Sequence, residues 1–164
     1  MSAAYHIPDE PRPGRFAAYT VHPFWPLITL MLAGSWIGLP WFVVNGIAMG
    51  SASLRKEIIA AVATPFGAIA MLIVASLALQ RLVPPHLLPL GRLVEYRDVL
   101  VVAVKLAFGY WIYLSQQRSF EIYRHFGGPV RQGMLIAVGA TFLRNYLASG
   151  GAHAPDWLRL AVSL

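Results

Sequence analysis

The sequence contains no cysteine and few charged residues. The absence of cysteine excludes disulfide bonds, iron–sulfur clusters, thiolate-bound metals and cysteine nucleophiles. Charged residues make up 12% of the chain and hydrophobic residues 57%, whereas about a quarter of the residues of a soluble domain are charged. This composition excludes most classes of soluble enzyme and any disordered or fibrous protein, and it predicts an integral membrane protein.

The sequence also lacks the motifs of common catalytic sites. It has no His-Glu-x-x-His zinc motif, no Gly-x-Ser-x-Gly nucleophile elbow, no glycine-rich phosphate loop and no aspartate-rich run. A haem held between helices usually needs histidines that face each other. The histidines instead fall in predicted tails, loops or span ends: His6, His22, His86, His125 and His153. We therefore expect a non-catalytic protein without a metal or another cofactor.

Basic residues outnumber acidic ones, and the formal net charge is +6. A nucleic-acid-binding protein gathers its cations on one polar face. Here lysine and arginine are scattered between apolar runs, so nucleic acid is not an expected partner. Cations that flank a membrane more naturally contact the headgroups of anionic phospholipids.

Apolar runs of spanning length predict an all-α fold, an integral membrane four-helix bundle with short loops. The expected spans are about residues 25–49, 58–80, 98–116 and 130–149, between a proline-rich extended arm over 1–23 and a short tail over 151–164. Only Gly50 to Glu57 separate the first two spans, which should therefore be antiparallel neighbours. Pro40 and Pro65 lie within these two spans and favour kinks.

Two alternatives to this topology stay open. Arg12 and Arg15 before the first apolar run are also typical of a signal peptide, but the run is longer than the ~7–15 apolar residues of such a leader. Lys105 and Arg144 interrupt the third and fourth runs. The second half of the chain is therefore alternatively an amphipathic segment that lies at the membrane surface.

Four spans place both termini on one side of the membrane, with the connection between the second and third spans. That side would carry six basic residues against five on the other, so the positive-inside rule barely discriminates. If Lys105 and Arg144 reach toward the same side, the balance favours cytoplasmic termini. The expected location is a bacterial inner (plasma) membrane, with the bacterial origin inferred from composition alone.

Small residues recur at four-residue spacing within the spans, as at helix contacts in membranes. The expected helix-packing residues are Gly34, Gly38, Gly46, Gly50, Ala60, Thr64, Ala68, Gly133 and Ala137. Most of these faces should close the bundle itself, while some are available to a partner protein.

Two cations lie within predicted spans, where ionisable side chains are costly. Lys105 and Arg144 are at similar depth, because the spans that carry them run in opposite directions. If both point inward they form a site for an anion such as a lipid phosphate or a carboxylate, with Asn145 beside Arg144 as a hydrogen-bonding group. If they point outward they extend toward the headgroups without a specific role.

A second polar set is expected at the opposite membrane face. Ser51 and Ser53 are suited to cap the second span, and Glu57 lies in its early turns. We predict an ion pair between Glu57 and either Arg118 or Arg124.

These features favour a non-catalytic protein that acts through contact. The predicted function is an accessory, assembly or scaffold subunit of a larger membrane complex, with partner subunits and anionic phospholipids as its contacts. The alternative is a small oligomeric anion channel or carrier that uses Lys105 and Arg144.

Overall fold

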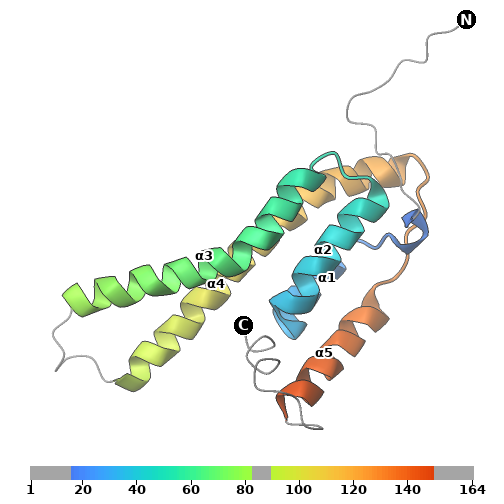
Figure 1. Ribbon diagram of the computed structural model, residues 1–164. Coiled ribbons are helices and arrows are strands. Elements are labelled where there is room, and N and C mark those ends of the chain that lie inside the picture. Colours follow the sequence, from blue (N-terminus) through green and yellow to red (C-terminus); the bar gives the residue numbers. More distant parts are fainter. Residues whose placement is uncertain (1–15, 83–89, 150–164) are drawn as a thin grey trace, which may run out of the picture.

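The computed structural model describes residues 16–82 and 90–149, and within them the side chains except those at positions 79, 80, 82, 90–98 and 148. Every named element in these ranges is helical (Figure 1). The elements are the 3-10 turn η1 (Ala17–Tyr19), α1 (Phe24–Ala33), α2 (Ser35–Met49), α3 (Leu54–Leu82), α4 (Leu90–His125) and α5 (Met134–Ala148). The predicted tail over 151–164 and most of the predicted arm over 1–23 lie outside the described residues.

Two of the described helices are long and apolar enough to cross a membrane. Their apolar portions run over Leu54–Ala78, 25 residues in α3, and Val99–His125, 27 residues in α4. The spans predicted over 58–80 and 98–116 lie within these two helices. The other helices have 10 residues in α1 and 15 each in α2 and α5. These are about 15 to 22 Å long, shorter than the ~30 Å hydrocarbon core.

The first predicted span is not one helix. Gly34, with φ 90° and ψ 178°, ends α1, and α2 begins at the next residue. This φ lies in a region that residues with a Cβ rarely adopt. After this turn the chain folds back on itself. The close approach of the two helices is seen at Gly38, where a Cβ would lie 2.4 Å from the Cα of Leu30. The segment over 25–49 is therefore a helical hairpin, and hydropathy missed its turn because apolar residues flank Gly34 on both sides.

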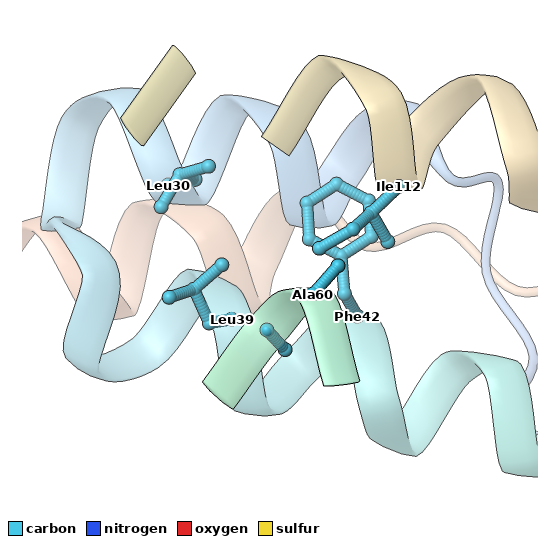
Figure 2. Packing of buried hydrophobic residues seen from close by; sticks show 6 residues of the cluster. Leu30, Leu39, Phe42, Ala60 and Ile112 are labelled. Carbon is cyan, nitrogen blue, oxygen red and sulfur yellow. The ribbon is translucent and has the colours of Figure 1, made fainter. Parts of the chain in front are cut away.

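The helices pack around this hairpin. α3 and α4 form a long antiparallel pair, α2 contacts both, and α1 lies between α2 and α5. The main core contains Leu30 and Leu39 of the hairpin, Phe42 of α2, Ala60 of α3 and Ile112 of α4 (Figure 2). Small side chains on α3 therefore let α2 and α4 approach closely.

The tip of the hairpin lies partway along α3 and α4. Figure 1 shows the far ends of these two helices extending away from α1, α2 and α5. α3 bends along its length, and Pro65 near its middle removes one backbone donor from the helix.

The segment before α1 lies at the same end of the fold as the turns before α3 and α5. The backbone N–H of Arg131 donates to the carbonyl of Thr20 at 2.8 Å. The hydroxyl of Tyr123 donates to the carbonyls of Ala17 and Pro129, each at 3.2 Å. This end, called the polar end below, comprises residues 17–23, 45–57 and 115–133.

Candidate functional site

Polar side chains are buried at the polar end, where α2 ends, α3 begins and α4 passes. Glu57 and Gln116 are 0% exposed and Asn45 is 1% exposed. Ser51 and Ser119 are also buried. Burial of so many polar groups is tolerated only when they bond to one another.

Glu57 is the centre of this network. Its Oε1 accepts hydrogen bonds from the hydroxyls of Ser51 at 2.5 Å and Ser53 at 2.6 Å. Its Oε2 accepts a hydrogen bond from Nε2 of Gln116 at 2.8 Å. A Cβ on Gly46 would lie 2.5 Å from the same Oε2, so a larger residue at position 46 would require the carboxylate to shift. Three donors from two other parts of the chain therefore hold one acidic group without a cation.

Two amide side chains extend the network across the fold. Gln116 also donates from Nε2 to the carbonyl of Phe42 at 2.7 Å, and its Oε1 accepts from Nδ2 of Asn45 at 3.4 Å. Oδ1 of Asn45 accepts from the backbone N–H of Val21 at 2.9 Å. The network thereby joins the segment before α1, α2, α3 and α4.

The serine hydroxyls have a defined direction. Ser51 and Ser53 each have one hydroxyl proton and both donate it to Glu57. Ser119 must then donate to Ser51 at 3.1 Å, while Ser115 donates to Ser53 at 3.1 Å. All four hydroxyl protons are therefore directed toward the carboxylate.

An open cavity of about 600 Å³ adjoins this network. Ser53, Ser115 and Ser119 contribute to its wall, and Lys56 and Arg118 line it as well. Both cations are exposed. The cavity therefore combines hydroxyl oxygens with two exposed positive charges at the polar end.

The ion pair predicted for Glu57 is replaced by these hydrogen bonds. Glu57 faces the interior between α2, α3 and α4, whereas Arg118 and Arg124 are exposed on α4. The sequence could not reveal this, because Gln116 reaches the carboxylate from 59 residues away along the chain, and Ser119 bonds to Ser51, which itself donates to Glu57.

His22 lies at the same end. Its ring packs edge-on against Phe120 with 4.7 Å between centroids, and its Nδ1 accepts from the N–H of Phe24 at 3.2 Å. Burial, and then the positive charge of Arg124, lower the pKa of His22 below its ordinary value of 6.5. The neutral imidazole is therefore favoured in the fold.

The tip of the hairpin is a second polar region. Nη1 of Arg144 donates to the carbonyl of Leu32 at 2.7 Å, and the indole N–H of Trp36 donates to the carbonyl of Ala33 at 2.8 Å. The last carbonyls of a helix have no partner within it. Arg144 and Trp36 therefore satisfy the end of α1.

Lys105 lies beside this tip. It lines a groove of about 430 Å³ between α2, α3 and α4, together with Ser35 and Trp36 at the start of α2. Arg144 is close enough for the two positive charges to repel each other. The anion site predicted from these residues stays a prediction: Arg144 binds the carbonyl of Leu32, Lys105 lines the groove, and Asn145 lies exposed on α5. Asp98 and Glu95, the acidic residues nearest before Lys105 in the sequence, lie outside the described side chains.

The predicted packing residues lie within the fold. Gly34 forms the hairpin turn, and Gly50, with φ 66°, ends α2 in the left-handed conformation. A Cβ on Gly133 would lie 2.6 Å from Trp25. The remaining ones are buried: Gly38, Gly46, Ala60, Thr64, Ala68 and Ala137. Gly139 of α5 is among the glycines that sequence reasoning passed over, and a Cβ on it would meet nothing within 4 Å.

Within the described residues, no three histidine or acidic side chains gather as a metal site would require. Comparison of the chain with protein-family models, with curated proteins and with solved structures finds no match.

Proposed function

We propose that this chain is a non-catalytic multi-pass membrane protein that acts as an accessory, assembly or scaffold subunit of a larger membrane complex. The proposal rests on the exposed apolar outer face of α5. This face comprises Leu135, Ile136, Gly139, Phe142, Leu143 and Tyr146. Leu135 is 85% exposed and Phe142 72% exposed. We propose that this face binds a transmembrane helix of a partner subunit.

The length and packing of α5 support this role. With 15 residues it is too short to cross the hydrocarbon core by itself, and α1 is its principal neighbour in the fold. A short apolar helix in lipid carries a cost of hydrophobic mismatch. A partner helix against α5 would remove part of that cost.

Gly139 supports the same face as a contact surface. A glycine within a helix costs about 1 kcal/mol relative to alanine, so its presence needs a compensating gain. For Gly38, Gly46 and Gly133 the compensating gain is close packing inside the fold, because a Cβ at these positions would lie too close to neighbouring atoms. At Gly139 the space is open, and a small residue there lets another helix approach closely.

The arrangement of the helices supports an orientation in the membrane. We propose that α3 and α4 cross fully, that the α1–α2 hairpin enters and returns, and that the polar end is cytoplasmic. The polar end carries Arg55, Lys56, Arg118, Arg124 and Arg131, against Arg81, Arg92 and Arg97 at the far ends of α3 and α4. The positive-inside rule then favours a cytoplasmic polar end of a bacterial inner membrane. Its exposed cations would contact anionic phospholipids.

Photo-crosslinking tests the proposed face. A photoactivatable amino acid at Phe142 should cross-link to a different protein in the native membrane. The matched control is Val74, which is 61% exposed on α3 and should cross-link mainly to lipid. Only lipid adducts at both positions would overturn the proposed interface.

The alternative function, an oligomeric anion channel or carrier, is supported by the position of both Lys105 and Arg144 beside the tip of the hairpin. Purified protein in liposomes should then conduct chloride, and Lys105→Gln should reduce the flux at least tenfold. Absence of flux in a reconstituted homo-oligomer would exclude this alternative.

A further inference from the structure

Lys105 lies near the middle of the membrane if α3 spans it. Gly67 of α3 packs against Phe108 of α4, with 3.4 Å between a Cβ on the glycine and the ring. Lys105 is one turn from Phe108 and lines the groove with Ile69 and Leu72. Residue 69 is at the midpoint of the uncharged run over 58–80. The backbone of Lys105 is therefore level with the centre of this apolar segment, and its side chain extends from there.

The groove that Lys105 lines is otherwise apolar or neutral. Its wall comes from α2 with Leu39 and Val43, from α3 with Val62 and Ile69, and from α4 with Val101. Lys105 is the one charged residue among those that line it. The groove has a volume of about 430 Å³ and is open, so an occupant can approach from outside the fold.

The charge of Lys105 has no described counter-ion. Glu57 and Glu121 are the only carboxylates among the side chains that the structure describes, and both lie at the polar end. Gln116, which binds Glu57, lies 11 residues beyond Lys105 on α4, or about 16 Å along the helix. The charge of Arg144, which acts on Lys105, is also positive, and Arg144 holds the carbonyl of Leu32. An ionisable side chain at this depth is stabilised by an opposite charge.

The depth of Lys105 decides between two sources of negative charge. Phospholipid headgroups lie at the membrane surface, about 15 Å from the centre of a ~30 Å hydrocarbon core. A helix satisfies its own backbone and can place a carboxylate at the centre. The depth therefore favours a protein helix over a lipid as the source of the anion, which differs from the lipid contact that the sequence suggested for Lys105.

We infer that the groove between α2, α3 and α4 binds an apolar helix of the partner subunit that carries an aspartate or glutamate near its centre, and that Lys105 pairs with this carboxylate. The inference rests on the proposed function, since it requires a partner subunit. It assigns a second contact, separate from the outer face of α5, and it specifies the chemistry of the partner.

Variants at Lys105 test the pairing in the native membrane. Lys105→Met should reduce the amount of partner recovered with the tagged protein at least tenfold, while Lys105→Arg, which keeps the charge, should retain most of it. Asp98→Asn is the internal control, because Asp98 lies two turns before Lys105 on the same helix. Loss of the partner in Asp98→Asn as well as in Lys105→Met would overturn the inference by making the counter-ion internal.

Cross-linking identifies the occupant independently of folding effects. A photoactivatable residue at Leu72, in the groove, should cross-link to an apolar partner segment that contains an acidic residue. Adducts with lipid alone, or with a segment that lacks aspartate and glutamate, would overturn the inference. If Phe142 cross-links to a partner and Leu72 only to lipid, the proposed function stands and the inference about the groove fails. If neither position cross-links to a partner, the proposed function and the inference both fail.

Discussion

Gly38 of α2 lies directly against the backbone of Leu30 in α1, so closely that a Cβ on Gly38 would be 2.4 Å from the Cα of Leu30. This contact and the turn at Gly34 make a hairpin from a segment that hydropathy alone treats as one span. Because the obstructing atom belongs to the backbone, the space cannot be recovered by shortening the side chain of Leu30.

Gly38→Ala should therefore destabilise the fold by about 3 kcal/mol through overpacking. The measurement is thermal or denaturant unfolding in mild detergent. Leu30→Ala should not rescue the variant. The matched control is Gly139→Ala, where the Cβ meets nothing within 4 Å and stability should be unchanged or slightly raised. Equal effects of the two substitutions would contradict the hairpin contact.

The position of the N-terminal segment distinguishes the hairpin from a single first span. The hairpin places Ala18 on the same side of the membrane as the α4–α5 turn, and a single span would place them on opposite sides. The chain has no cysteine, so a maleimide can label this protein only at a cysteine that is introduced. Ala18→Cys and Gly127→Cys should react with a membrane-impermeant maleimide only after permeabilisation of the inner membrane. Reaction of only one of the two variants in intact cells would support four spans instead.

Glu57 should contribute strongly to stability because its truncation leaves several buried donors without an acceptor. We expect Glu57→Ala to cost about 3 kcal/mol, with a smaller loss for Glu57→Gln, which keeps the shape and one acceptor. Glu121→Ala is the control, since Glu121 is exposed and accepts one bond from Gln117 at 3.1 Å. Unfolding curves of these variants in detergent provide the comparison, and similar midpoints for Glu57→Ala and Glu121→Ala would contradict the network.

His22 should make stability depend on pH. Its pKa in the fold is lowered by burial and by Arg124, so the unfolded chain binds a proton more readily than the folded chain below the ordinary pKa of 6.5. The contribution of His22 is therefore fully present above pH 6.5 and decreases as the pH falls toward the lowered pKa.

Melting temperatures from pH 7.5 to 5.5 test this dependence. The loss on acidification should be smaller in His22→Gln, which cannot titrate, and also smaller in Arg124→Gln, which removes the repelling charge. Identical pH profiles for the protein and for His22→Gln would count against a lowered pKa of His22.

Hydropathy predicts α3 and α4 well because one long uncharged run and one run with a single lysine are visible without tertiary information. It does not predict the turn at Gly34, since Gly34 and Ser35 are two small residues within a long apolar run that contains no charge. The sequence identifies Glu57 as a residue in need of partners but suggests arginines. Its actual partners include Gln116, which only the packing of α4 against α2 and α3 brings near.

The similar depth of Lys105 and Arg144 is predicted by counting residues inward along helices that run in opposite directions, and the structure places each of them beside the tip of the hairpin. The different contacts of the two side chains depend on the hairpin. Arg144 satisfies the carbonyl of Leu32 at its tip, while Lys105 lines the groove. The carbonyl of Leu32 is available to Arg144 only because α1 ends at Gly34, and sequence analysis did not predict this end.

The most direct test of the proposed function is the mass and protein composition of the particle extracted from the native membrane in mild detergent, for the unmodified chain and for Gly139→Leu. We predict that the chain co-migrates with other proteins at fixed stoichiometry and that Gly139→Leu loses them, while Ala70→Leu, at an exposed position of α3, retains them. A particle that contains only copies of this chain would contradict the account.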